Sequence, residues 1–181
     1  MIYKFTFSCE EGDPDFRRVF EADADATFLE LHEAILKSVG YPDDQMTSFF
    51  LCNDEWEKGQ EVTLVEMGDS FEYDNMTMEQ THLNELLFEQ KQRMLYVFDP
   101  MYDRCFFGSL SKITPGEMEG VKLIDKKGTA PEQLLKEDPT SKVTGSDMDL
   151  DTDFYGNDAY DEGDIDMEGF QDLSFDDGSM F

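Results

Sequence analysis

The sequence predicts an α+β fold, with a single compact domain over residues 1–139 and an acidic tail over residues 140–181. Several short segments alternate apolar and polar residues with the period of a β-strand. A run after residue 27 instead has the period of an amphipathic helix. Near Pro139 the composition changes, because acidic residues then dominate. We therefore expect an N-terminal β-hairpin, a helix, a mixed or antiparallel sheet and a second helix, followed by a disordered tail.

The N-terminal hairpin is predicted by two segments that are separated by turn residues. Residues 2–9 (IYKFTFSC) alternate, which places three aromatic side chains on one face. Gly12 and Pro14 then interrupt the chain and favour a turn. Residues 16–21 (FRRVFE) are the expected partner strand.

The first helix has clear start and stop signals. Thr27 is a suitable N-cap, and Glu30, three residues further on, completes the capping-box pattern. The residues expected to face the core share helical spacing: Phe28, Leu31, Ile35 and Val39. Gly40 favours termination, because glycine readily adopts the left-handed conformation of a helix C-cap.

The rest of the domain is expected to consist mostly of strands. The predicted strands cover residues 47–51, 61–65, 93–98, 104–110 and 121–125. A second helix is predicted over residues 78–90, where leucines occur at mixed helical spacing. The segment GTAPEQLLKEDP, from Gly128 to Pro139, predicts a short helical turn.

Net charge is the strongest global property of the chain. It has 43 acidic and 14 basic residues, a formal charge of −29. All the bases lie in residues 1–142, where they oppose 30 acids, and residues 143–181 contain 13 acids without a base. This surplus opposes direct binding to nucleic acid, whose phosphates require clustered lysine and arginine. It suits a protein partner, and a basic one in particular.

Cysteine usage and hydropathy predict a cytoplasmic protein. Cys9, Cys52 and Cys105 are widely spaced and odd in number, which argues against a disulfide framework. The N-terminal segment alternates too strongly for the apolar core of a signal peptide. No apolar run approaches the roughly 20 residues needed to span a bilayer, so no membrane partner is expected.

The tail resembles a calcium loop at first sight, because residues 147–153 read DMDLDTD. In an EF-hand register that starts at Asp147, however, Thr152 occupies the glycine position and Asp158 the closing glutamate position. Large apolar residues are spaced among the acids, and we expect three of them to be anchors for a partner: Leu150, Phe154 and Tyr155. An inert solubilising tail is the alternative.

No catalytic constellation is evident, and neither an enzyme activity nor a cofactor is expected. Four arginines are too few for the cluster that serine recombination requires. A Cys–His dyad with His32 is conceivable, but this histidine lies on the apolar side of the predicted helix, where a packed imidazole is commoner. The cysteines lie in apolar strands, which favours buried, inert thiols, and no zinc-ligand spacing is present.

Several of these segments together resemble the plasmid pRiA-type ORF-three-like family, which includes TnpR passenger proteins of insertion elements. The motif residues at the start are Phe16-Arg17-Arg18, Thr27-Phe28, Leu31-His32, Ile35 and Gly40-Tyr41. The later strand pair, LYVFDPMYDRCFF, and the element GTAPEQ resemble the same family. The resemblance covers about residues 2–135 and excludes the tail.

The resemblance implies a compact α+β fold, with a ubiquitin-like core as one form of it, and no defined activity. The chain departs from the family at a turn that is usually Asp-Phe-Gly-Asp-x-Trp, since Asp99 is followed here by PMYDR. Asp99 and Arg104, with Arg17 and Arg18, are the predicted binding residues. The two adjacent arginines form either a clamp for phosphate or carboxylate, or structural ion pairs.

These observations favour a non-enzymatic cytoplasmic binding or adaptor module whose tail meets protein partners. The alternative is an accessory regulator of mobile-element DNA transactions that acts through a basic protein or by imitating DNA. A weaker third hypothesis is an enzyme with a cleft near Asp99, Asp103 and Arg104.

Overall fold

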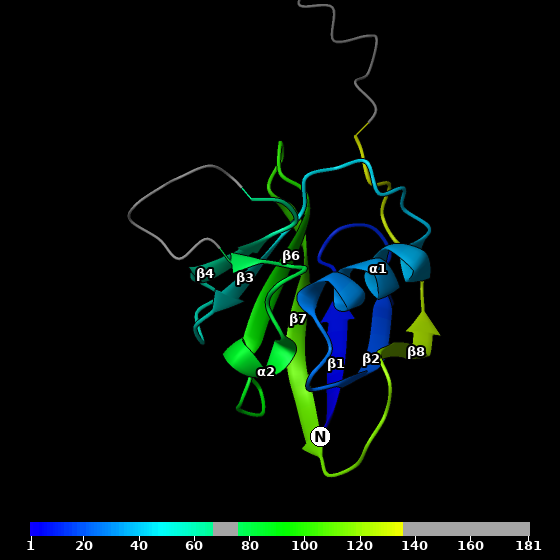
Figure 1. Ribbon diagram of the computed structural model, residues 1–181. Helices are drawn as coiled ribbons and strands as arrows, with labels where there is room; N and C mark the ends of the chain where they lie inside the picture. The colour runs from blue at the N-terminus through cyan, green and yellow to red at the C-terminus, as the bar shows by residue number, and fades with distance from the viewer. Residues whose placement is uncertain (67–75, 136–181) are drawn as a thin grey trace, which may run out of the picture. The chain divides into compact units, whose positions relative to one another are not determined.

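The computed structural model describes residues 1–66 and 76–135 of the 181-residue chain. The predicted domain boundary at residue 139 and the predicted disordered tail lie outside the described residues. The described part belongs to one compact unit, Met1–Lys136. It is an α+β structure built mostly of strands, as the sequence predicts (Figure 1).

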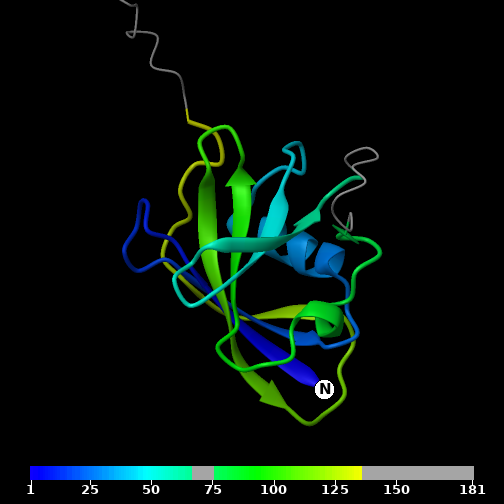
Figure 2. The same ribbon diagram turned by 90° about the vertical axis from the view of Figure 1, so that its left-hand side faces the viewer.

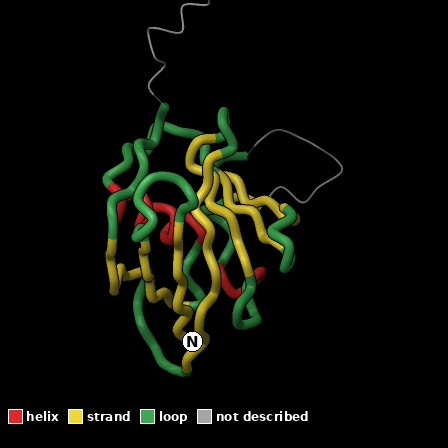
Figure 3. The backbone as a smooth tube through the Cα atoms, turned by 180° about the vertical axis from the view of Figure 1, so that it is seen from behind, coloured by secondary structure: helices red, strands yellow, loops and turns green. Residues whose placement is uncertain are grey.

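Eight strands form one mixed sheet, in the order β5-β4-β3-β6-β7-β1-β2-β8. The strands are β1 (Ile2–Ser8), β2 (Arg17–Asp23), β3 (Ser48–Cys52), β4 (Lys58–Thr63), β5 (Met76–Thr77), β6 (Arg93–Asp99), β7 (Arg104–Thr114) and β8 (Val121–Lys127). All neighbours are antiparallel except β4 and β5, which are parallel. The central strands in this order are β3, β6, β7 and β1, and Figure 3 shows the sheet from behind.

The predicted hairpin is formed by β1 and β2. Phe5 lies opposite Phe20, and Ser8 lies opposite Arg17. On its other side β1 pairs with β7, with a register shift after Lys4. The extra residue, Ser111, lies on β7, and Tyr3, Phe5 and Phe7 of β1 alternate without interruption and stay buried. The ubiquitin-like core stays a prediction.

Helix α1 (Phe28–Val39) begins and ends where the sequence predicts. Thr27 accepts a hydrogen bond from the Glu30 backbone, and the Glu30 side chain accepts one from the Thr27 backbone. Gly40 closes the helix with φ 76°. Of the expected apolar stripe, Val39 is only partly buried, because it lies in the last turn.

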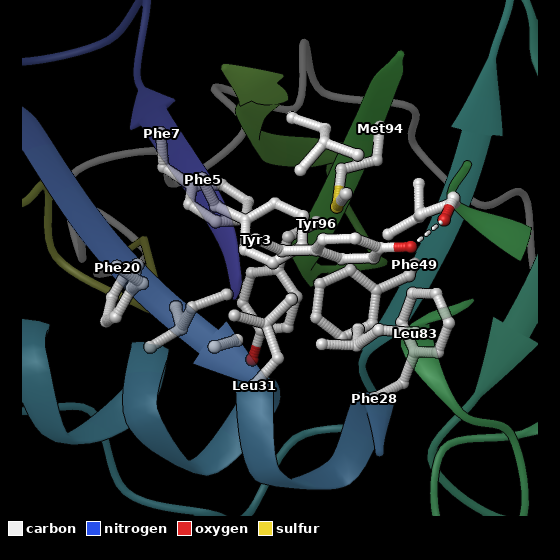
Figure 4. Close-up of a cluster of buried hydrophobic side chains, with 14 of the residues drawn as sticks. Tyr3, Phe5, Phe7, Phe20, Phe28, Leu31, Phe49, Leu83, Met94 and Tyr96 are labelled. Carbon is white, nitrogen blue, oxygen red and sulfur yellow. Dashed lines mark hydrogen bonds between the residues drawn. The ribbon is translucent and has the colours of Figure 1, made fainter. Parts of the chain in front are cut away.

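The core lies between α1 and one face of the sheet and is rich in aromatic rings (Figure 4). The rings of Phe49 and Tyr96 are 4.9 Å apart, and those of Phe28 and Phe49 are 5.3 Å apart. Each fully buried side chain of this size contributes about 1.5–3 kcal/mol through removal from water. The Tyr3 hydroxyl donates to the Leu87 carbonyl at 2.6 Å, so its polar end is satisfied as well.

The predicted second helix over residues 78–90 is wrong in length. Only α2 (Leu83–Leu86) is helical there. Gln92 accounts for the early end, since its side-chain oxygen accepts from the backbone N–H groups of Phe88 and Glu89. Its amide also donates to the Leu86 carbonyl at 2.6 Å. These bonds use backbone groups that a longer helix would need.

The predicted helical turn after Gly128 is absent from residues 128–135, the described part of that segment, which we call the strap. Side chains from other elements bind the strap carbonyls, and we return to these contacts below. These bonds hold the strap against other elements in place of a helical path. No helix in the described residues is long and apolar enough to cross a membrane.

Candidate functional site

Arg17 and Arg18, two of the predicted binding residues, lie on opposite faces of β2. Arg17 is exposed and contacts the Asp125 carboxylate at 2.5 Å. Arg18 is 3% exposed and donates from Nη1 to the Lys127 carbonyl at 2.6 Å and from Nη2 to the Gly128 carbonyl at 3.2 Å. The pair therefore does not act as one clamp, because each guanidinium is directed to a different protein group.

Asp99 and Arg104, the other two predicted binding residues, form a buried ion pair at the ends of β6 and β7. Arg104 Nη1 lies 3.4 Å from Asp99 Oδ2, and the side chains are 6% and 2% exposed. Arg104 Nε also donates to Glu11 Oε2 at 2.7 Å, and Nη1 to the Gln133 carbonyl at 3.2 Å. Burial alone would lower the pKa of Arg104, but the contacts with Glu11 and Asp99 raise it.

A stack of aromatic rings separates the two buried guanidinium groups. The stack consists of Phe16, Phe106, Tyr41 and Phe98, with neighbouring ring centroids 4.6–6.1 Å apart. Arg18 lies over the Phe16 ring at 4.4 Å, and Arg104 over the Phe98 ring at 5.1 Å. Burial lowers the pKa of Arg18, whose Nε has no hydrogen-bond partner among the described residues. The ring beneath it supplies a cation–π contact instead.

The strap is tied down across this stack. The Tyr41 hydroxyl donates to the Pro131 carbonyl at 2.5 Å. The Gln133 amide donates to the Pro42 carbonyl at 3.2 Å, and the Thr129 backbone donates to Asp13 at 2.9 Å. Arg18 and Arg104 also bind strap carbonyls, and Asp99 pairs with Arg104. Their arrangement is structural and gives no support to the hypothesis of a catalytic cleft, while Asp103 is exposed and contacts Lys58.

His32 lies in a second polar cluster and is fully buried. Its Nδ1 is 2.8 Å from the Tyr96 hydroxyl, and its Nε2 is 3.3 Å from Asp43 Oδ1. Burial lowers the pKa of His32, so the imidazole is neutral near pH 7, with Nε2–H donating to Asp43 and Nδ1 accepting from Tyr96. The Thr47 hydroxyl is 3.3 Å from Nδ1 as well.

The cysteines have no histidine partner. Cys9 Sγ is directed to the Cys105 carbonyl at 3.8 Å, and Cys52 Sγ to the Phe50 carbonyl at 3.5 Å. All three thiols are half-buried and free. Burial raises the pKa of Cys105 to about 11, which leaves it a poor nucleophile at neutral pH. Residues 1–66 and 76–135 contain no group of three or more potential metal ligands.

A groove of about 740 Å³ lies between α1 and β8, and none of the four predicted binding residues lines it. Ala34 and Lys37 line it from the helix, and Val121, Lys122 and Leu123 line it from the strand. Figures 1 and 2 show α1 on one face of the sheet and β8 at the outer edge beside β2. The groove therefore runs along a strand at the edge of the described sheet, where backbone groups on one side have no strand partner among the described residues.

The charges along β8 fall into two sets. Asp125 pairs with Arg17, and Lys127 Nζ is 2.8 Å from Asp15, so these residues join β8 to neighbouring segments. The lysines that line the groove are Lys37, Lys122 and Lys126. None of these three takes part in an ion pair within the described residues.

Two acids, Glu30 and Glu33, also line the groove. Glu30 is already engaged in the capping box. Three lysines against two glutamates make the groove locally positive, although residues 1–142 carry a net charge of −16. The sequence contains both elements of this groove, but nothing local in it places residues 30–38 beside residues 121–126. The predicted tail anchors, Leu150, Phe154 and Tyr155, lie outside the described residues.

Comparison with solved structures finds a similar fold in a protein of unknown function, MM3350, from Methanosarcina mazei Go1. The match has a TM-score of 0.57 and 19% sequence identity, and covers 72% of this chain and 71% of that one. No curated protein matches the sequence. A family described as "Plasmid pRiA4b ORF-3-like protein" matches residues 1–133, which include the hairpin, α1, the stacked rings and most of the strap. The chain belongs to this plasmid pRiA4b ORF-3-like family.

Proposed function

We propose that the protein is a non-enzymatic, cytoplasmic binding module that holds a protein partner in the groove between α1 and β8. The observation that carries this proposal is the edge strand itself, which offers Leu123 and Ile124 at 40% and 45% exposure. Aliphatic side chains on an unpaired edge invite pairing with another chain. Lysines on an edge strand can also prevent such pairing. That protective role would not require the groove of about 740 Å³ that lies beside β8.

The buried charges support a non-enzymatic role. Arg18, Asp99 and Arg104 are the charged groups expected at a site, and each is directed to a protein group that it stabilises. His32 is neutral and satisfied by Tyr96 and Asp43. These groups therefore serve the fold, and recognition is left to the surface of the groove.

A photo-crosslinking experiment in the host cytoplasm tests the proposal. A photoreactive phenylalanine analogue replaces Ile124 in the full-length chain, and a matched control carries it at Met101, which is 82% exposed and far along the sheet from β8. We expect a specific crosslinked protein from position 124 that is absent from position 101. The same products from both positions, or none from either, would contradict the proposal.

The tail provides a second proposed contact, through Leu150, Phe154 and Tyr155. Replacing all three by serine in the full-length chain is expected to reduce the recovery of the partner without removing the crosslink at position 124. If recovery is unchanged, the tail is an inert solubilising segment.

The alternative function, regulation of mobile-element DNA transactions through a basic protein, is favoured by the net charge of −29. It predicts that the full-length protein competes with DNA for a basic DNA-binding protein, and that the competition weakens as salt is raised. An absence of competition at low salt would exclude it.

A further inference from the structure

We propose that the groove binds an extended segment of a partner protein in which acidic and apolar residues alternate, and that this segment adds to the sheet beside β8. The inference rests on the proposed function, because it names the chemistry of the partner at the same groove. Three features carry it: the free edge of β8, two exposed aliphatic side chains and three lysines without an ion-pair partner in the described chain.

The free edge determines the conformation of the partner. Within residues 1–66 and 76–135, β8 has seven residues and pairs only with β2, whereas β5, at the other end of the sheet, has two. In an edge strand, alternate residues direct their N–H and C=O groups away from the sheet. An added strand is the chain conformation that satisfies such groups in sequence.

The side chains around the edge determine the partner's composition. Leu123 and Ile124 offer apolar surface that is still in contact with solvent. Lys122 and Lys126 flank these two residues in the sequence of β8, and Lys37 lines the groove from α1 together with Leu123. Because successive residues of a strand point to opposite faces, a bound segment presents one alternating set to the groove and the other outward. The apolar set meets Leu123 in the groove, and the flexible ammonium groups of Lys122 and Lys126 extend past the strand edge to form charge-assisted hydrogen bonds with the outward carboxylates.

For a ligand in the groove, the nearby lysines matter more than the negative net charge of the whole molecule. At physiological ionic strength the Debye length is about 8 Å, so the distant acids are largely screened while the groove lysines are in contact. The other charged residues of β8, Asp125 and Lys127, are already paired with Arg17 and Asp15. Lys122 and Lys126 are thus the ammonium groups of this strand that remain for a ligand, beside Lys37 of α1.

Two other occupants fit less well. A second copy that pairs its own β8 antiparallel about Ile124 would place Lys122 of one copy opposite Lys126 of the other, and like charges in opposed positions destabilise a strand pair. Nucleic acid offers phosphates but no aliphatic side chains for Leu123, and the three lysines of the groove are few beside the clustered bases that drive its binding through counterion release.

Fluorescence anisotropy with the full-length protein tests the proposal. The probe is a labelled peptide of alternating glutamate and leucine, and the comparison peptide alternates lysine and leucine. We expect the glutamate peptide to bind at least about tenfold more tightly. The double variant Lys122→Glu/Lys126→Glu is expected to weaken that binding by about tenfold or more, since both charges are reversed at the contact.

A matched control is Lys4→Glu/Lys112→Glu, which makes the same charge change on two lysines that face each other across β1 and β7. It is expected to alter the affinity by less than about twofold at physiological salt. An equal loss in this control would show that bulk charge alone is responsible and would overturn the proposal. Hydrogen exchange gives a second measurement: the bound peptide is expected to slow exchange in β8, and protection confined to other strands would overturn the pairing.

Three other outcomes would show that the groove binds a different occupant or none. If the lysine peptide binds more tightly and Leu123→Asp abolishes its binding, the groove remains a docking site but the acidic partner is wrong, so the proposed function survives. If replacing Leu150, Phe154 and Tyr155 by serine raises affinity for the glutamate peptide about tenfold, the chain's own tail competes for the groove, and the assignment to a partner protein fails. If neither peptide binds, the inference is wrong, and the crosslink at position 124 decides separately whether a partner occupies the groove.

Discussion

Arg104 and Asp99 form a buried ion pair across the end of the β6–β7 hairpin, with Nη1 of the arginine 3.4 Å from Oδ2 of the aspartate. Glu11, from the turn between β1 and β2, accepts from the same guanidinium at 2.7 Å, and the strap carbonyl of Gln133 accepts at 3.2 Å. One arginine therefore joins three segments that are far apart in the sequence. Removal of one charge of this pair leaves the other without its buried partner.

We predict that Asp99→Ala lowers the free energy of unfolding by about 3 kcal/mol, because Arg104 then stays buried with only the half-exposed Glu11 as its counter-charge. Urea denaturation followed by circular dichroism measures the loss. The control is Asp15→Ala, which breaks the exposed pair with Lys127 and is expected to cost less than about 1 kcal/mol. Equal losses in the two variants would show that the buried pair has no special role.

We predict that protonation of His32 lowers the free energy of unfolding as the pH drops below 6.5. Burial lowers the pKa of this imidazole in the folded protein from the ordinary 6.5, so the unfolded chain takes up the proton first. Stability from this group is complete above pH 6.5 and is lost as the pH falls towards the lowered pKa, by up to about 1.4 kcal/mol for each pH unit. Urea midpoints between about pH 8 and about pH 5 measure the slope.

The chain's other histidine supplies the control for this slope. His82 is exposed, and its Nδ1 lies 2.6 Å from the Asp25 carbonyl. We expect His82→Gln to retain the pH dependence of the wild type, and His32→Gln to lose the part that begins near pH 6.5. A slope that persists in His32→Gln would assign it to the carboxylates instead.

Gly128 marks the point where β8 passes into the strap. Its φ is +68°, and a Cβ there would lie 2.7 Å from the Phe16 backbone nitrogen. We predict that Gly128→Ala lowers the melting temperature markedly, because backbone atoms must move in addition to the left-handed strain of about 1 kcal/mol. Gly40→Ala is the matched control, since Gly40 has φ +76° and nothing within 4 Å of its Cβ position. Equal losses would mean that the contact with Phe16 is unimportant.

Tyr41→Phe is predicted to loosen the strap without unfolding the domain. The substitution removes the hydroxyl that donates to the Pro131 carbonyl, and keeps the ring that stacks between Phe98 and Phe106. We expect a loss of about 1 kcal/mol and faster hydrogen exchange in residues 128–135. Tyr102→Phe, at an exposed position of the β6–β7 turn, is expected to change neither quantity. Exchange that is unchanged in Tyr41→Phe would show that the strap is held by other contacts.

Local patterns in the sequence predict the helices and strands that interactions between neighbouring residues produce. The capping box of Thr27 and Glu30 and the glycine at position 40 define α1, and alternation defines the hairpin of β1 and β2. The predicted second helix is too long because the leucines of this segment satisfy a helical pattern. Gln92 lies outside that pattern and binds backbone groups that a longer helix would need. The strap does not form its predicted helical turn because side chains from distant segments bind its carbonyls.

By itself, the sequence determined the fold class, the family resemblance and the confinement of all 14 basic residues to residues 1–142. Only the tertiary structure decided what the charged residues do. It paired Asp125 with Arg17, buried Arg18 and Arg104 at the two ends of an aromatic stack, and left Lys122 and Lys126 along a groove. The physical reason is that β8 finds β2 across about a hundred residues of chain, and no local propensity encodes which neighbours such a pairing brings together.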